Sequence, residues 1–346
     1  METLHLPPTS TPVSFEYEKD FVDAISTVHT PVPYGTEHMN DGAPVITEKV
    51  PLNINSDEKG KAGAGDSLVD TESSTAGTCK HAITREEFLL PSFQPEEMRK
   101  IVQEAILLAG GAVAILLQVA EPGVGRGVDE HSNFAYRPID RLRTTMTYVY
   151  CMVYGTVEEK QAIINMVHRA HSVVRGENYS ADDPELQLWV SATLYAAATE
   201  IYEKFFGELD EETNDEIYRE YSVLASSLRV PAELWPVNRA AFWTYFNHKL
   251  DTVVVTPYAK NVCRDLLFNK KTPFILKGGM PMIRVLTAEW LPPRLREAYG
   301  IKRKPRTYKV VLTLLKAIYP SLPASIRTYP VKFYLRDMRK RLRNAV

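Results

Sequence analysis

The segment from 186 to 206 constrains the fold more than any other part of this chain, because it is apolar or small on nearly every side. It reads LQLWVSATLYAAATEIYEKFF. Asp183 is a suitable N-cap before it, and Pro184 suits the first helical position. A helix of this composition has no polar face for solvent, so it must lie among other helices. The sequence therefore predicts an all-α bundle with this helix buried in the middle.

Helical patterns continue on both sides of that segment, from residue 83 onward. Strand-like alternation is confined to short pieces such as TVVVTPY and RTYKVVL. The most apolar run is AILLAGGAVAILL, from 105 to 117, and its length of about 13 residues falls short of the roughly 20 that a membrane span needs. We interpret it as a buried core helix, with a segment that dips into a membrane as the alternative. The predicted fold is one helical domain over about 86–346.

Residues 1–85 have a different composition from the rest of the chain. They are rich in Pro, Ser, Thr, Gly and Asp, as in KGKAGAGDSLVDTESSTAG. Such a composition cannot offset the entropy lost on ordering a chain, so we expect most of this segment to be disordered. The first 20 residues also lack the basic start and apolar run of a secretion signal.

Charge and cysteine content exclude several classes of protein. The net charge of −2 argues against a general nucleic-acid binder. Cys79, Cys151 and Cys263 are far apart, and no pair has the spacing of metal ligands. A sparse, odd set of cysteines indicates reduced thiols in a reducing compartment, so we expect a cytoplasmic protein.

The helix predicted over 138–154 carries a stripe of polar and polarisable side chains. Pro138 suits its first position, and Gly155 suits the residue just past its end. At 100° per residue, four side chains of this helix fall within about 60° of one another. Thr144 lies at the margin of the stripe. The four are a cation, a hydroxyl, a phenol and a thioether: Arg141, Thr145, Tyr148 and Met152.

The next predicted helix ends with two histidines three residues apart. Thr156 and Glu159 have the spacing of a capping box at its start, and the pattern runs to Gly176. On the helical wheel, His171 lies about 60° from the apolar centre and His168 about 120° from it. We therefore expect His171 to face inward and His168 to lie near the rim. The apolar centre consists of Ile163, Val167, Ala170 and Val174.

The common catalytic motifs are missing from the sequence. It contains no HExxH zinc motif, no Glu-x-x-His pair of the kind used in helical di-iron sites, and no GxSxG elbow. What remains is the inward imidazole of His171. It is either a hydrogen-bonded core residue or an axial ligand to haem iron in an apolar cavity, and spacing alone favours the core residue. Arg141 is similarly either part of such a site or the partner of Asp140 or Glu158 in an ion pair.

Several segments, in this order and spacing, resemble the latex-clearing rubber oxygenases and the oxygenases of mycophenolic acid biosynthesis. The resemblance covers roughly 90–270. Its most specific parts are the R-x-x-x-T segment in RPIDRLRTTMTYV and the H-x-x-V-x-G…Y-x-A-x-D-P-x-L…W-V run in HRAHSVVRGENYSADDPELQLWVSATL. The segment SLRVPAELWPVNRAAFWTYFNHKL fits the same pattern.

The resemblance implies an all-helical, globin-like core that holds haem b. It makes His171 the proximal iron ligand, with His168 as the alternative. It places Arg141 and Thr145 on the distal side, where they would stabilise the negative charge that dioxygen gains.

The stripe on the 138–154 helix contains two further candidate site residues, and the position next to it differs from the family pattern. We expect Tyr148 and Met152 to contact the cofactor. Rubber oxygenases carry a lysine immediately before the threonine of the R-x-x-x-T segment, whereas this chain has Thr144 among the distal residues. Threonine cannot cap iron as a lysine can, so the resemblance extends to oxygen chemistry and not to polyisoprene cleavage itself.

Together these features predict a haem b-dependent oxygenase of secondary metabolism. Its substrates would be dioxygen and an apolar small molecule, such as an isoprenoid or another alkene. Two alternatives stay open: a haem-binding protein without turnover, and a helical interaction protein whose histidines are core residues. An absorption spectrum separates the last from the others, and oxygen consumption separates the first two.

The carboxyl-terminal region is strongly basic. Between Arg294 and Arg343 there are 15 Lys or Arg residues but two acids, Glu297 and Asp337. The last segment, VKFYLRDMRKRLRNAV, is also amphipathic. It is either a solvated basic face that balances the acidic middle of the chain or a peripheral contact with an intracellular membrane, since basic amphipathic helices bind anionic lipids.

Overall fold

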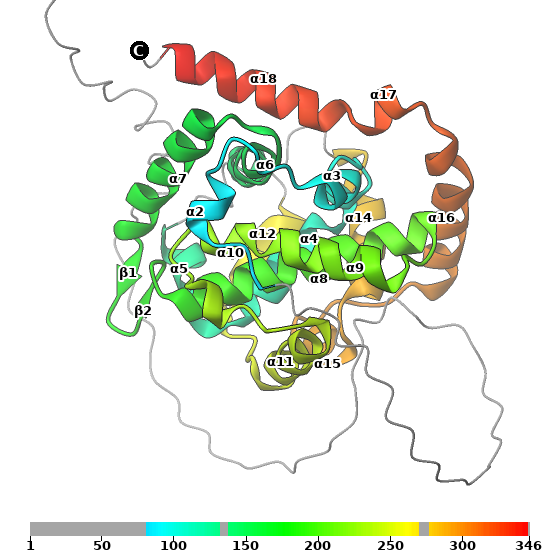
Figure 1. Ribbon diagram of the computed structural model, residues 1–346. Coiled ribbons are helices and arrows are strands. Elements are labelled where there is room, and N and C mark those ends of the chain that lie inside the picture. The colour runs from blue at the N-terminus through cyan, green and yellow to red at the C-terminus, as the bar shows by residue number, and fades with distance from the viewer. Residues whose placement is uncertain (1–80, 132–137, 270–276, 345–346) are drawn as a thin grey trace, which may run out of the picture.

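The computed structural model describes residues 81–131, 138–269 and 277–344, and nearly all of its regular structure is helical (Figure 1). The strands in that part of the chain, β1 (Arg175–Gly176) and β2 (Tyr179–Ser180), form one short antiparallel hairpin. The predicted all-α fold is confirmed. The helices are α2 (Arg85–Phe88), α3 (Glu96–Val102), α4 (Leu107–Ala120), α5 (Pro122–His131), α6 (Pro138–Tyr154), α7 (Val157–Ser172), α8 (Pro184–Phe206), α9 (Glu211–Tyr221), α10 (Val223–Ser226), η1 (Ala232–Leu234), α11 (Arg239–Thr252), α12 (Pro257–Phe268), α14 (Met280–Trp290), α15 (Pro293–Ala298), α16 (Pro305–Ile318), η2 (Tyr319–Ser321), α17 (Ala324–Arg327) and α18 (Tyr329–Asn344).

The predicted central helix, α8, runs through the middle of the molecule beside α4 (Figure 1). Its Asp183 cap accepts a hydrogen bond from the backbone N–H of Glu185 at 2.8 Å, and Pro184 occupies the first turn. The two helices approach so closely that a Cβ atom on Gly110 of α4 would lie 2.0 Å from Cδ1 of Ile201. A side chain at position 110 would therefore force the Ile201 side chain to move, and glycine leaves room for it.

The most apolar run of the chain forms α4, and the structure confirms it as a buried core helix. Most of its side chains are buried, and α5, α8, α12 and α14 pack around it. No single helix among the described residues is long and apolar enough to cross a membrane. α3 and α4 reach that length only together, and they are bent by 96° at the break between them.

α6 and α7 form a packed pair whose ends were largely predicted. α6 has the expected bounds. At the start of α7, Thr156 Oγ1 accepts from the Glu159 N–H at 3.2 Å, and the Glu159 carboxylate accepts from the Thr156 N–H at 3.0 Å, so the predicted capping box is present. α7 ends at Ser172 and not near Gly176, because the chain turns there into the β1–β2 hairpin.

The basic carboxyl-terminal segment packs against the domain as α18, which lies along α6. Arg143 of α6 binds Asp337 with nitrogen–oxygen distances of 2.6 and 2.7 Å, and Arg339 binds Glu159 at 2.7 Å. The inner face of α18 is part of the hydrophobic core. Its buried side chains are Val331, Tyr334, Leu335 and Met338.

The predicted disordered segment, 1–85, lies almost entirely outside the described residues. Ile83 is buried, and its backbone N–H donates to Ser222 Oγ at 2.9 Å, so the packed core begins before the predicted boundary at 86. Cys151 and Cys263 are free thiols, and burial raises the pKa of both to about 12, which keeps them protonated. Cys79 lies outside the described residues.

Candidate functional site

A cavity of about 230 Å³ lies where α5, α6, α7 and α8 meet. Four of the predicted site residues line it: Thr144, Thr145, Tyr148 and His171. The helical periodicity of α6 and α7 therefore brings them to one place, as the sequence suggested. The rest of the wall is mainly aliphatic and includes Val124, Val167, Val174, Leu186, Leu194 and Leu228.

His171 is half-buried in the last turn of α7, beside a fixed carboxamide of α8. Gln187 Nε2 donates to the Ala181 carbonyl at 2.7 Å, and Gln187 Oε1 accepts from the Arg229 N–H at 2.9 Å. These two bonds set the orientation of the carboxamide, since exchanging its N and O would place like groups together. Its Nε2 lies 3.4 Å from His171 Nδ1, longer than a typical hydrogen bond. The contact is therefore a long, weak hydrogen bond between α7 and α8.

The α6 side of the cavity consists of two hydroxyls and one aromatic ring. Thr144 is half-buried and Thr145 is exposed. The hydroxyl of Tyr148 donates to the Leu224 carbonyl at 2.8 Å and lies 2.7 Å from Ser227 Oγ. Burial raises the pKa of Tyr148. The ring of Tyr148 therefore shapes the cavity while its hydroxyl is bound within the fold.

The structure does not place the other two residues of the predicted stripe, Met152 and Arg141, on the cavity wall. Met152 is wholly buried in the hydrophobic core and is not part of the cavity wall, and its contact with a cofactor stays a prediction. Arg141 lies within α6, but its side chain is outside the part of the chain that the structure describes. Its distal position stays a prediction.

His168 is half-buried like His171 but does not line the cavity. Burial lowers its pKa, and the nearby charges of Arg229 and Arg85 lower it further. Its Nε2 atom is buried and has no hydrogen-bond partner among the described residues. Of the two histidines, His171 is the one placed to bind a group in the cavity.

The sequence did not predict a hydrogen-bond network at the edge of the cavity. His131 Nε2 and the Tyr179 hydroxyl, both on the wall, are 2.9 Å apart. The Tyr179 hydroxyl donates to Glu130 Oε2 at 2.6 Å, and Arg126 Nε donates to Glu130 Oε1 at 2.8 Å. Burial alone would raise the pKa of Glu130, but these two bonds outweigh it and lower that pKa. Burial and the Glu130 bond raise the pKa of Tyr179.

Only part of this network had a signal in the sequence. Tyr179 begins the Y-x-A-x-D-P piece of the family pattern, so that motif could have identified it. His131 and Glu130 lie at the end of α5, a glycine-rich helix, and the sequence analysis did not single out either residue. Gln187 lies between two leucines in a helix that the sequence predicted to be buried, which is itself a reason to expect a hydrogen-bond partner.

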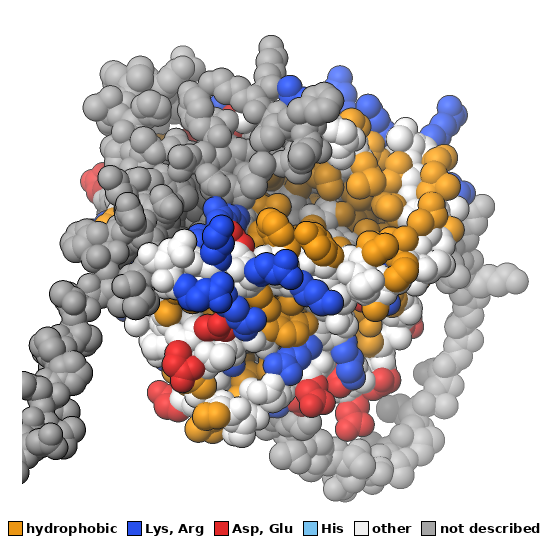
Figure 2. All heavy atoms as spheres, turned by 90° about the horizontal axis from the view of Figure 1, so that it is seen from above, with side chains coloured by type: hydrophobic (Ala, Val, Ile, Leu, Met, Phe, Trp, Pro, Cys, Tyr) orange, Lys and Arg blue, Asp and Glu red, His pale blue; other side chains and the backbone are white. Residues whose placement is uncertain are grey.

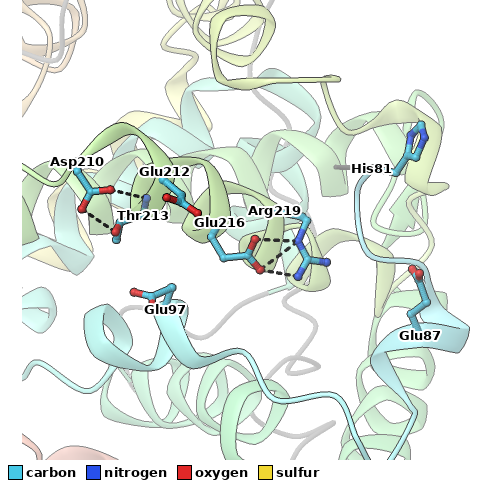
Figure 3. A pocket seen from close by; sticks show the side chains of 8 residues that line it. All are labelled: His81, Glu87, Glu97, Asp210, Glu212, Thr213, Glu216 and Arg219. Carbon is cyan, nitrogen blue, oxygen red and sulfur yellow. Dashed lines mark hydrogen bonds and ion pairs between the residues drawn. The ribbon is translucent and has the colours of Figure 1, made fainter. Parts of the chain in front are cut away.

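A larger hollow of about 810 Å³ lies elsewhere, near α2, α3 and α9 (Figure 3). Its side chains are mostly acidic, and several are exposed. Asp210 accepts hydrogen bonds from the backbone and side chain of Thr213, and Arg219 binds Glu216 (Figure 3). These bonds stabilise the start and the last turns of α9, so we interpret the hollow as a solvated acidic surface.

The chemistry of the α5–α8 cavity fits a haem. Among the described residues, no group of three or more His, Cys, Asp or Glu could hold a metal ion by itself. A porphyrin provides four iron ligands of its own, so the single imidazole of His171 in an aliphatic cavity is sufficient. The volume of about 230 Å³ is below the roughly 300–1,000 Å³ of pockets that enclose small molecules. Binding a macrocycle therefore requires the walls to separate.

Comparison with known proteins covers most of the helical region. Residues 98–318 match the family described as ER-bound oxygenase mpaB/B'/rubber oxygenase, catalytic domain. An uncharacterized protein of Mycobacterium bovis and one of Mycobacterium tuberculosis are each 30% identical to the chain over 246 residues, which cover 67% of this chain and 96% of each relative. No solved structure matches the chain, so the globin-like arrangement of its helices stays a prediction. The matched range includes all of α5, α6, α7 and α8.

Proposed function

Since the chain belongs to the family of ER-bound oxygenase mpaB/B' and rubber oxygenase catalytic domains, it has an oxygenase-type function, and we propose that it depends on haem b and oxidises an apolar, alkene-containing small molecule. The observation that carries this proposal is the meeting of His171 with Thr144, Thr145 and Tyr148 on one mainly aliphatic cavity.

In this proposal His171 holds the haem iron, and Gln187 restricts the orientation of its imidazole. The haem, when bound, supplies the redox chemistry that activates dioxygen. The hydroxyls of Thr144 and Thr145 are hydrogen-bond donors for negative charge that develops on oxygen, and Arg141 is expected to add a cation. Donors of this kind are most effective where water is excluded, because the local dielectric constant is low.

The cavity wall favours an apolar substrate. Eight valine and leucine side chains contribute to it, so transfer of an alkene from water to this surface is favourable. The hydroxyl of Tyr148 is already bound to Leu224 and Ser227, so this residue presents its ring to the cavity. An isoprenoid or a similar unsaturated hydrocarbon chain matches such a lining.

The haem assignment is tested with His171→Ala and the matched variant His168→Ala. Both histidines are half-buried on one helix, but only His171 lines the cavity. We expect wild-type protein and His168→Ala to purify with a haem Soret band and with iron, and His171→Ala to lose most of both. Far-UV circular dichroism checks that each variant is folded. Equal Soret absorbance per protein in wild type and His171→Ala would contradict the ligand assignment.

The oxygenase assignment is tested separately by oxygen consumption. Haem-loaded protein is mixed with an isoprenoid alkene in an oxygen electrode, with the corresponding saturated alkane as the control. Consumption with the alkene alone is expected. A haem protein that consumes no oxygen with either compound would instead be a carrier or a sensor.

A further inference from the structure

The helices α16, α17 and α18 expose a hydrophobic surface. Half of the large hydrophobic side chains that are exposed in the described part of the chain fall between residues 310 and 333. No residue of α16 is buried. Three of its side chains form a single row, because residues four apart share one face of a helix. They are Val310, Leu314 and Ile318, each at least 54% exposed.

Aliphatic and aromatic residues continue this surface beyond α16. Ile326 of α17 is exposed, as are Tyr329 and Phe333 one turn apart at the start of α18. The rings of Tyr329 and Phe333 have centroids 6.2 Å apart. On the helical wheel of α18, these two residues fall within about 60° of Arg336 and Lys340. One face of α18 therefore combines aromatic rings with cations.

Cations accompany the apolar residues on that face. Figure 2 looks down on the side of the molecule where α18 lies and shows hydrophobic side chains beside Lys and Arg. The acid of α18, Asp337, binds Arg143 and Arg341. Within the described residues, no carboxylate pairs with the exposed cations of α18. These cations are Lys332, Arg336, Lys340 and Arg343, and α16 adds Lys309 and Lys316.

The opposite side of these helices is anchored to the core, so the surface is held in place. The Tyr319 hydroxyl, just after α16, donates to Glu104 Oε2 at 2.8 Å and accepts from the Ile106 N–H at 3.0 Å. Arg327 of α17 donates to Glu104 Oε1 at 2.6 Å. Arg339 of α18 binds Glu159. The exposed apolar side chains are therefore a fixed feature of the folded domain.

We propose that this surface, named here the α16–α18 face, docks onto a membrane that contains anionic lipids. Val310, Leu314, Ile318, Tyr329 and Phe333 would enter the headgroup region while the cations bind lipid phosphates and carboxylates. Aliphatic and aromatic side chains combined with Lys and Arg are the composition of helices that lie in a membrane interface. Each cation near an anionic surface strengthens binding about fivefold.

Another protein and a second copy of this chain fit the α16–α18 face less well than a membrane does. Interfaces between proteins are depleted in lysine, whereas this face carries Lys309, Lys316, Lys332 and Lys340. A second copy of the chain would bring two cationic surfaces together, which is unfavourable. The docking is independent of the proposed haem chemistry, although an enzyme for apolar substrates gains access to them at a membrane.

The test is co-sedimentation of the full chain with vesicles of phosphatidylcholine alone or with added phosphatidylserine. One variant replaces the row on α16: Val310→Ser, Leu314→Ser and Ile318→Ser. A second removes two cations: Arg336→Gln and Lys340→Gln. The control, Val237→Ser with Val254→Ser, changes two exposed valines outside the face.

Wild-type protein and the control are expected to bind the phosphatidylserine vesicles and to bind less tightly as salt is added. Removing two cations should weaken binding about 25-fold, from about fivefold for each. Replacing the α16 row should weaken it at least tenfold, because three apolar side chains no longer leave water. Circular dichroism confirms that the variants fold.

Three results would overturn the proposal. The first is wild-type protein that binds neither kind of vesicle. The second is equal binding by the α16 variant and wild type. The third is wild-type protein that dimerises without lipid in analytical ultracentrifugation while the α16 variant stays monomeric, since the face would then join two copies of the chain.

Discussion

The cavity between α5 and α8 and the α16–α18 face both combine apolar and polar side chains. In the cavity these side chains have partners within the fold, whereas on the face they are exposed to solvent. In the cavity, the polar groups have partners within the fold, as Gln187 has in two backbone groups and Tyr148 has in Leu224. On the face, Leu314 is exposed and Arg336 has no carboxylate partner among the described residues. The neighbours of a side chain therefore decide whether it stabilises the fold or is available for binding. Substitutions in the cavity should cost stability, and substitutions on the face should not.

The largest loss of stability is expected for Gln187→Leu. The substitution removes both atoms that bind the Ala181 carbonyl and the Arg229 N–H. Leaving two such groups without partners costs about 2–6 kcal/mol of unfolding free energy, at about 1–3 kcal/mol for each. Urea unfolding measures the change. A loss below about 1 kcal/mol in Gln187→Leu would mean that the bonds contribute little to stability.

Tyr179→Phe should have the next largest effect, because it removes the hydroxyl that binds Glu130 and His131. We expect a loss of about 1–3 kcal/mol for the unsatisfied partners. The pKa of Glu130 is lowered in the folded protein. Its stabilising effect is therefore present above the pKa of an unfolded Glu and is lost as the pH falls through the lowered value.

The same variant also changes how stability depends on pH. Without the Tyr179 bond, the pKa of Glu130 moves up toward its value in the unfolded chain, so Tyr179→Phe should lose less stability than wild type as the pH falls through the acidic range. Melting temperatures measured across the acidic range test this. Parallel curves for the two proteins would show that the bond does not influence the ionisation of Glu130.

The smallest effect on stability is expected on the α16–α18 face. The variant with Val310→Ser, Leu314→Ser and Ile318→Ser should change the unfolding free energy by no more than about 0.5 kcal/mol at each position. Its binding to anionic vesicles should nevertheless fall. If this variant lost as much stability as Gln187→Leu, the face would be part of the core and the contrast with the cavity would be wrong.

Local sequence features predicted the helix ends well. The Thr156 and Glu159 capping box and the Asp183 cap each depend on residues within one turn, and all are present. The prediction for α7 erred at its far end, because the hairpin at Gly176 depends on pairing with Tyr179. Contacts between neighbours in sequence are thus easier to predict than those made by the tertiary fold.

The candidate site was predicted in part, for a related reason. Helical periodicity predicted that Thr145 and Tyr148 share a face of α6 and that His171 faces inward on α7, and all three line the cavity. The stripe to Met152 spans about 16 Å along the helix axis, so its far end reaches the core instead. Gln187 and the network around Tyr179 belong to other elements, and only their packing against α7 and α5 reveals their positions.

The ion pairs that join α18 to α6 and α7 also have a consequence for folding during translation. Ribosomes release helices in chain order, so α6 and α7 emerge well before the helix whose Arg339 and Asp337 hold them. During that interval Tyr150, which later packs against Tyr334 with ring centroids 5.9 Å apart, has no cover from α18. The growing polypeptide therefore exposes this apolar surface of α6 until α18 has been translated.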